Sequence, residues 1–278
     1  MSSSPDLLHP GARRPHRVVV LISDEVMPRH TGAVLVRAGV HVVGLVICGR
    51  ESFLERLQFV TRWARRHGAF TTFGQILGRL VDRSANGTRD ERVLHALVDP
   101  AADETSIRSA GFPVYQTDSY SRPDTLAAIR ALDPDVFVVH TKYIVGKSVR
   151  ALARVAVIGG HPGVTPHYRG AYSPFWALLH GRPDMVGYTV FLLDDGVDTG
   201  PILYQDVVPI EHGVDSHLTL AWKGMIRQAE LQASAIKRLD AGESLPLRTV
   251  REVPPDSYFG PPTLWDMVRY RRAQRTAR

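Results

Sequence analysis

The chain has 278 residues, of which 44% are hydrophobic and 22% charged, a composition typical of a globular protein with a sizeable core. Its single cysteine, Cys48, excludes an intrachain disulfide and a cysteine metal cluster. No apolar run approaches the roughly 20 residues of a membrane helix, and residues 1–16 lack the apolar core of a signal peptide. We therefore expect a cytoplasmic protein with no membrane partner and no metal.

The formal net charge of +6 comes from two basic segments. Residues 50–83 contain seven arginines against three acids, a net charge of +4, and residues 269–278 contain five arginines and no acid. The rest of the chain is therefore left at −3, so the presumed core is slightly acidic. This distribution argues against a nucleic-acid partner, and a basic patch can equally steer an anionic small substrate.

The first elements alternate between strand and helix. Short apolar, β-branched runs at residues 16–22 and 40–47 predict buried strands. A helix is expected between them, at residues 26–38, and Gly39 is a natural residue to end it. Strand–helix–strand order with few polar interruptions predicts an α/β fold, with a mostly parallel sheet covered by helices on both faces.

A segment of different character follows at residues 51–83. Its apolar residues recur at helical spacing, which predicts a helical insertion of two amphipathic helices, hinged near His67 and Gly68. We interpret them as a pair packed on the sheet; a lid or a surface for a homodimer is the functional alternative. Asn86-Gly87-Thr88 is interpreted as a turn.

The alternation then resumes. Strands are expected at residues 93–98, 112–115, 136–140, 156–160, 186–193 and 202–208, and helices at residues 122–132, 146–153 and 172–180. The glycine-rich dinucleotide fingerprint and the phosphate-binding P-loop are both absent, which argues against the usual nucleotide-binding readings of such a sheet. We divide the chain into a disordered tail at residues 1–15, a main α/β domain at 16–210 and a short helical extension at 211–278.

Two unusual loops follow strands of the predicted sheet, where sites of α/β proteins lie. Residues 159–170 are dense in glycine and proline and contain His161, for which a structural and a catalytic role are equally plausible on this pattern. Residues 194–203 contain three acids but lack the ligand spacing of a calcium loop. Asp198 lies among small and apolar residues, so its carboxylate could orient an imidazole.

Together the two loops resemble a family signature. The pattern His-Pro-x-x-x-Pro-x-Tyr-Arg-Gly, followed by Gly-x-Thr-x-x-x-x-Asp-x-Gly-x-Asp-x-Gly-x-Ile, is similar to that of formyltetrahydrofolate-dependent formyltransferases. The resemblance extends from about residue 136 to residue 205. It implies a Rossmann-like formyltransferase fold, 10-formyltetrahydrofolate as the formyl donor, and His161 and Asp198 as catalytic residues.

The resemblance also implies where the folate binds. Its pterin end would lie against the backbone after the strand at residues 136–140 and against the second loop. The residues concerned are Thr141, Lys142, Tyr143, Ile144, Val145, Asp194, Asp195, Gly196 and Val197. We expect the acceptor to be an amine or hydroxylamine nitrogen of a small metabolite. Methionyl-tRNA is disfavoured because no second β-rich domain is expected after Gln205.

One residue departs from the family pattern. The family has asparagine two residues before the histidine, and this chain has Gly159 there; its only asparagine is Asn86. Lys142 or Thr141 could supply the missing donor, and we therefore include Lys142 among the catalytic candidates. Alternatively, His161 acts alone as an imidazolium. A third reading is that formyl transfer is lost, which leaves a non-catalytic folate or small-molecule binding protein or a 10-formyltetrahydrofolate hydrolase.

Overall fold

The computed structural model describes residues 14–49, 53–250 and 252–276. The strands within these ranges are β1 (Val18–Ser23), β2 (Val42–Cys48), β3 (Val114–Thr117), β4 (Val136–His140), β5 (Ala156–His161), β6 (Arg169–Gly170), β7 (Gly187–Leu192), β8 (Ile202–Val207) and β9 (Tyr258–Phe259). The helices are α1 (Val26–Arg37), α2 (Phe53–His67), α3 (Ala69–Leu97), α4 (Pro100–Ser109), α5 (Pro123–Ala131), α6 (Lys147–Arg150), α7 (Ser173–Leu179), α8 (His217–Asp240) and α9 (Leu264–Thr276), with a 3-10 turn at η1 (Pro183–Met185).

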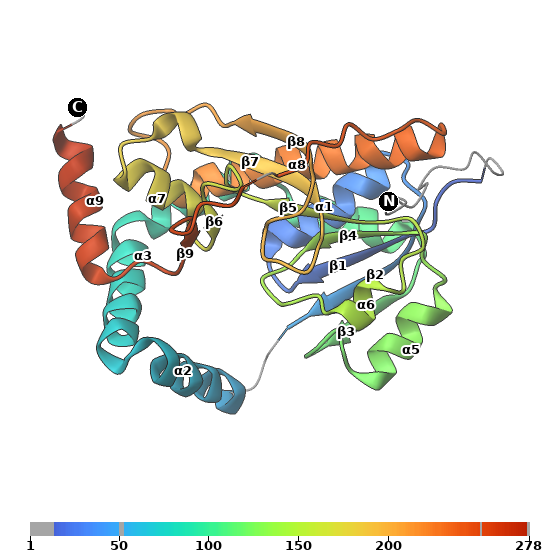
Figure 1. Cartoon of the computed structure of the whole chain (residues 1–278), viewed down its shortest axis with the longest axis horizontal. Helices are drawn as coiled ribbons and strands as arrows, with labels where there is room; N and C mark the ends of the chain where they lie inside the picture. Colours follow the sequence, from blue (N-terminus) through green and yellow to red (C-terminus); the bar gives the residue numbers. More distant parts are fainter. Residues whose placement is uncertain (1–13, 50–52, 251, 277–278) are drawn as a thin grey trace.

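The main sheet has the strand order β3-β2-β1-β4-β5-β7-β8, with helices on both of its faces (Figure 1). Neighbouring strands from β3 to β5 are parallel, whereas β7 runs antiparallel to β5 and β8 antiparallel to β7. The predicted Rossmann-like, mostly parallel sheet is therefore confirmed. From β1 the chain adds β2 and β3 on one side of the sheet, and it then adds β4 and β5 on the other side. The order of strands therefore reverses between the parallel strands β1 and β4, and their carboxyl ends and that of β5 form one edge where a ligand can bind.

The alternation of side chains along β1 explains why its first five residues, Val18 to Ile22, are all apolar. Val18, Val20 and Ile22 face one side of the sheet, where they join a core with residues of α1, α4 and α8. Val19 and Leu21 face the other side and join a core with residues of α5 and α6. A strand buried on both faces therefore favours apolar side chains at nearly every position.

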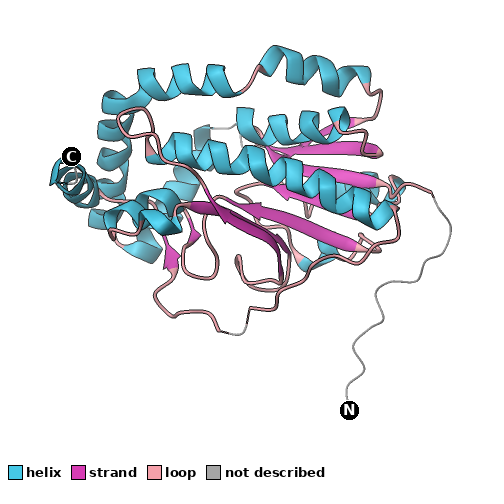
Figure 2. Ribbon diagram, turned by 90° about the horizontal axis from the view of Figure 1, so that it is seen from above, coloured by secondary structure: helices cyan, strands magenta, loops and turns pink. Residues whose placement is uncertain are grey.

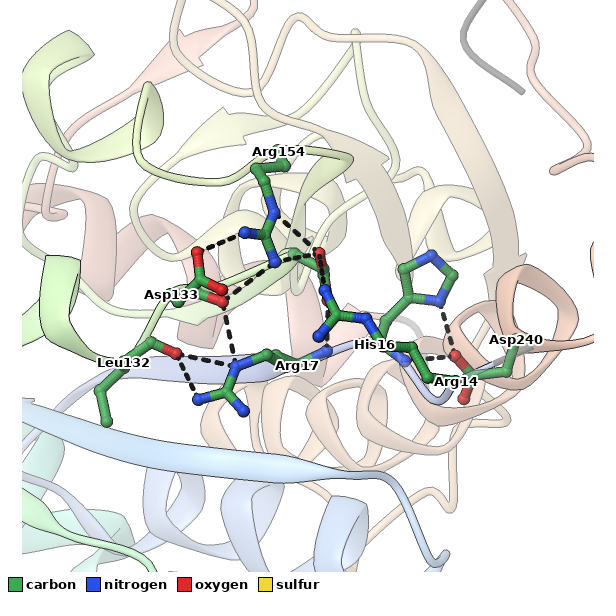
Figure 3. Close-up of polar contacts among 8 residues, drawn as sticks. Arg14, His16, Arg17, Leu132, Asp133, Arg154 and Asp240 are labelled. Atoms are coloured by element: carbon green, nitrogen blue, oxygen red, sulfur yellow. Dashed lines mark hydrogen bonds and ion pairs between the residues drawn. The ribbon is translucent and has the colours of Figure 1, made fainter. Parts of the chain in front are cut away.

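Hydrogen bonds and ion pairs anchor the amino ends of β1 and β4, opposite the carboxyl edge (Figure 3). The backbone N–H of Arg17 donates to Asp135 Oδ2 at 2.8 Å, and Arg154 Nη2 donates to Asp135 Oδ1 at 2.6 Å. Burial alone would raise the pKa of Asp135, but these donors lower it overall. His16 Nδ1 lies 2.6 Å from Asp240 Oδ1, which ties the start of the sheet to the end of α8. The tail predicted at residues 1–15 lies largely outside the described residues.

The helical insertion is present but longer than predicted. Gly68, with φ +90°, separates α2 from α3, which confirms the expected hinge. The strand predicted at residues 93–98 is wrong, because α3 continues to Leu97; a short apolar run does not distinguish a strand from the end of a helix. The turn at Asn86-Gly87-Thr88 is also wrong. Asn86 Nδ2 donates to Asp82 Oδ1 at 2.7 Å, one helical turn back.

The insertion packs on helices. The main contacts of α3 are with α9, α2 and α8, and Figure 1 shows α3 and α9 side by side at one end of the molecule. The expected packing of this pair on the sheet is therefore wrong. Gln75 of α3 links this helix to α2 and to the segment before α9. Its Oε1 accepts from Trp63 Nε1 of α2 at 2.8 Å, and its Nε2 donates to the Pro261 carbonyl at 2.9 Å.

The C-terminal helices have different roles in the fold. The long helix α8 packs on β5, β7 and α1, and it lies along the sheet in the view from above (Figure 2). Its residues Ala233, Ile236 and Leu239 belong to the core on that face. By contrast, α9 packs on α3 and α7. The domain boundary at residue 210 stays a prediction. Among the described residues, no helix combines the length and apolar character that a membrane crossing requires.

Candidate active site

His161 is the last residue of β5 and is buried, with 5% of its surface exposed. Its Nε2 lies 2.9 Å from the carbonyl oxygen of Tyr168 and 2.9 Å from Ser173 Oγ at the start of α7. A carbonyl can only accept, so Nε2 carries a proton that it donates to Tyr168. This contact orients the ring and leaves Nδ1 as the nitrogen on which a proton can exchange.

Asp198 approaches that second nitrogen. Its Oδ2 lies 3.4 Å from His161 Nδ1, within ion-pair range, and also accepts from the Gly170 N–H at 3.1 Å. The Asp198 side chain is 19% exposed, so this carboxylate reaches the surface while the imidazole does not. Asp198 has a positive φ of +54°. The two residues singled out in the sequence are therefore brought together, and both ring nitrogens of His161 face hydrogen-bond acceptors.

Thr189 holds the glycine- and proline-rich loop in place, and sequence reasoning did not single it out. It pairs with His161 across the β5–β7 ladder and is fully buried. Its hydroxyl donates to the Gly163 carbonyl at 2.7 Å and accepts from the Thr165 N–H at 3.1 Å. Gln205 Nε2 adds bonds to the Thr165 carbonyl and to the same hydroxyl. The threonine of the Gly-x-Thr pattern was the available signal.

The loop before Asp198 is closed by its own side chains. Asp194 Oδ1 accepts from the Gly196 N–H at 3.0 Å and from Thr199 Oγ1 at 2.8 Å, which forms a tight turn. Arg150 of α6 donates to the Asp194 carbonyl and forms an ion pair with Asp195, each at 2.5 Å. Arg150 holds the pKa of Asp195 below its usual value.

Arg150 was missed from sequence, although its position explains how the two predicted folate-binding segments meet. It lies on the helix that directly follows the 141–145 loop, and its guanidinium binds the 194–198 loop. Its side chain is only 16% exposed. The two segments are therefore neighbours at the same edge of the sheet.

The 141–145 loop presents both polar and apolar groups. Thr141 Oγ1 accepts from the Tyr143 N–H at 3.1 Å, Val145 is buried, and Ile144 is 89% exposed. Lys142 Nζ lies 2.6 Å from Glu25 Oε1, and both side chains are more than half exposed. The candidate donor Lys142 is thus engaged at the surface by a residue that precedes α1.

The position of the missing asparagine is filled by apolar side chains. A Cβ placed on Gly159 would lie 2.4 Å from Leu193 Cδ1 and 3.2 Å from Phe191 Cζ. Gly159 pairs with Phe191 in the sheet, and Phe191 is buried. No side chain fits here without displacing Leu193, so glycine at this position and leucine at 193 go together.

The polar groups at this edge do not form a metal site. In the parts of the chain that the structure describes, no group of three or more histidines, cysteines or acids could hold a metal ion. What the arrangement supplies instead is an oriented imidazole, a carboxylate beside it, and two neighbouring loops with exposed residues. Such a set can move protons and stabilise charge at a reacting carbonyl.

Comparison with known proteins agrees with this class of site. The sequence model of the family described as Formyl transferase matches residues 87–233, which is more than half of the chain and includes His161 and Asp198. The chain therefore belongs to the formyl transferase family. The match begins within α3, so it leaves out the first strands of the sheet.

Relatives with curated names match part of the chain. The methionyl-tRNA formyltransferase of Synechococcus sp. (strain JA-3-3Ab) is 33% identical over 175 residues, which span 62% of this chain and 52% of that protein. The methionyl-tRNA formyltransferase of Anaeromyxobacter sp. (strain K) is 34% identical over 154 residues, 55% of this chain and 48% of that protein. The chain matches about half the length of these relatives.

Solved structures share the fold. Glycinamide ribonucleotide transformylase 1 from Symbiobacterium toebii superposes with a TM-score of 0.56 at 18% identity, over 85% of this chain and 94% of that one. Phosphoribosylglycinamide formyltransferase from Anaplasma phagocytophilum gives 0.55 at 16% identity, over 82% and 88%. At this level of identity the likeness concerns the fold alone.

Proposed function

We propose that this protein transfers a formyl group from 10-formyltetrahydrofolate to an amine or hydroxylamine nitrogen of a small metabolite. The observation on which this depends is the approach of His161 Nδ1 to Asp198 Oδ2, at 3.4 Å, from two loops separated in sequence. Both residues lie within the region that matches the family. We assign His161 to proton exchange with the reacting groups, Asp198 to the stabilisation of its ring, and Lys142 to the oxyanion as a candidate donor.

The chemistry requires two proton movements. The acceptor nitrogen forms a bond to the formyl carbon while losing a proton, and the folate N10 gains a proton as its bond to that carbon breaks. His161 is suited to this exchange because Tyr168 fixes the proton on Nε2 and leaves Nδ1 to give or take one. Asp198 would stabilise the ring when both nitrogens are protonated, and its partly exposed carboxylate can pass the proton to water.

We place the folate's pterin end against Thr141, Lys142, Tyr143, Ile144 and Val145 and against Asp194, Asp195, Gly196 and Val197. The support is that Arg150 joins these segments into one edge. The self-closed turn at Asp194 leaves its backbone rigid, so groups that a ligand meets there are already oriented.

The oxyanion that develops on the formyl oxygen needs a hydrogen-bond donor or a positive charge beside it. Leu193 and Phe191 fill the space of the absent amide, so a neutral donor cannot come from position 159. Lys142 is our candidate, and it would have to leave Glu25 to act. His161 as an imidazolium is the alternative. These two are separable, since only the first predicts a loss of turnover in Lys142→Met.

The apolar filling also favours one second candidate, a folate-binding protein without transfer activity, since a site without an oxyanion donor can bind without reacting. Hydrolysis of the donor by water is a further outcome of the same test.

The test measures tetrahydrofolate release and formate release from 10-formyltetrahydrofolate, with and without a panel of amines, and folate binding by calorimetry. We expect amine-dependent release in the wild type. Asp198→Asn should lower turnover by about 10²-fold or more, and His161→Ala by more, with folate binding largely kept. Binding without any release would refute enzyme function, and release of formate without an acceptor would identify a hydrolase. Arg130→Ser on α5 is the control variant.

A further inference from the structure

The helix α3 has an unusual distribution of side chains. It buries Thr72, Gln75, Gly78 and Asp90, which are small or polar. Meanwhile a stripe of large apolar residues at helical spacing faces outward. Its members are Phe70, Phe73, Ile76 and Leu80, with exposures of 80%, 59%, 42% and 59%. A single chain rarely leaves such a contiguous stripe in water, so this face is suited to a partner.

The stripe continues onto α9 and contains a groove. Trp265, at the start of α9, is 65% exposed. The side chains of Phe70, Phe73, Leu77 and Trp265 line a groove of about 280 Å³. An aromatic ridge beside a hollow of this size can receive an apolar side chain of another protein. We call the stripe, the groove and Trp265 the α3–α9 face.

The helices that form this face carry several exposed arginines. Exposed arginines lie on the same helices and on the adjoining end of α2: Arg65, Arg66, Arg79, Arg83, Arg269 and Arg271. Arg83 follows Leu80 by three residues and so borders the stripe. The acids Asp82 and Asp266 on these helices already have partners. Asp82 accepts from Asn86 and lies 3.5 Å from His217, and Asp266 accepts from Thr263 at the start of α9.

These observations select among occupants. A second copy would set one arginine rim against another, because a two-fold interface places the same patch on both sides. A nucleic acid would match the charge but would leave the aliphatic part of the stripe without a partner. A flat anionic membrane would match both and yet make no use of a groove. An apolar centre with aromatic residues and an arginine rim is the composition of a protein–protein interface.

We infer that the α3–α9 face docks an acidic partner protein that presents an apolar helix face bordered by carboxylates. The apolar side of that helix enters the groove beside Phe73 and Trp265, and its acidic border meets the arginines. The docked partner would lie near the candidate active site. The ring centroids of Tyr270 of α9 and Phe175 of α7 lie 4.8 Å apart, and Ser173 at the start of α7 contacts His161.

The test uses the whole chain and defined probes. A fluorescent helical peptide with leucines on one face and glutamates on the other is titrated with protein, and its anisotropy is followed at rising salt. We expect binding that weakens with salt and falls at least tenfold in Phe73→Ser. Arg83→Ser should weaken it several-fold and flatten its salt dependence. Val114→Ser on the edge strand β3 and Arg130→Ser on α5 are matched controls, and they should bind like the wild type.

Other probes decide against the inference. They are a peptide with lysines in place of glutamates, a peptide with serines in place of leucines, single-stranded polyuridine, and vesicles of phosphatidylglycerol and phosphatidylcholine. If any of them binds as tightly as the acidic apolar peptide, the assignment is overturned. It is also overturned if sedimentation velocity finds a dimer that Phe73→Ser dissociates, because the occupant is then a second copy.

Discussion

Replacing Gly159 by asparagine tests whether Leu193 and Phe191 occupy the space of the family's asparagine side chain. The Cβ of any residue at 159 would lie 2.4 Å from Leu193 Cδ1, well inside van der Waals contact. The end of the leucine side chain can shift, so we place the cost of Gly159→Ala near the lower end of the about 1–3 kcal/mol range for overpacking. The amide of Gly159→Asn would be pressed against Leu193 and Phe191 without a partner, which adds about 1–3 kcal/mol.

Leu193→Ala is the compensating change. It removes the clashing carbon and opens the space in which an amide could reach a reacting oxygen. We therefore expect the double variant Gly159→Asn/Leu193→Ala to be more stable than the sum of the single changes predicts. Under the proposed formyl transfer, the double variant should also turn over faster than the wild type, by as much as about 10²–10³-fold where the amide becomes an oxyanion donor.

Urea unfolding and single-turnover release of tetrahydrofolate measure the two effects separately. A Gly159→Asn variant as stable as the wild type would contradict the predicted clash with Leu193. A double variant that folds and binds folate but turns over no faster than the wild type would show that the absent amide does not limit turnover. Leu193→Ala alone is the control, since it opens the space without supplying a donor.

Three further outcomes follow from the described contacts. Burial lowers the pKa of His140 to about 4 despite its bond to Gln232, so between pH 6.5 and pH 4 the unfolded chain binds a proton there that the folded chain does not. The free energy of unfolding should therefore fall by roughly 3 kcal/mol over this range. Urea titrations should find a smaller fall in His140→Leu. Thr189→Val should lower the free energy of unfolding in urea by about 1–3 kcal/mol, because it leaves the Gly163 carbonyl and the Thr165 N–H without the Thr189 hydroxyl. Thr125→Val is the comparison variant. Arg150→Met should raise the KM for the folate more than it lowers kcat, because Arg150 holds the two loops together without touching a reacting atom. An unchanged KM would count against this positioning role of Arg150.

Local sequence was sufficient to locate most strands of the sheet and the two loops that follow its strands. Strands such as β4 were predicted from continuous β-branched runs, because a strand buried on both faces leaves a pattern that few other structures produce. Glycine and proline density drew attention to the loop of His161, and small and apolar neighbours drew attention to Asp198. The catalytic roles of both residues came from the family resemblance and stay a prediction. Where local sequence was ambiguous, at residues 93–98, it failed, since a helix end and a short strand share the same apolar residues.

Only the tertiary structure decided what depends on residues far apart in the chain. Arg150 and Thr189 act on loops more than 20 residues away, so their roles have no local signature. The same is true of Leu193, whose side chain accounts for glycine at 159 only because β5 and β7 are neighbours. Helix periodicity marked the apolar positions of α3, but it could not say which would be covered. Burial is a property of the partners that a helix meets, and those are set by the fold as a whole.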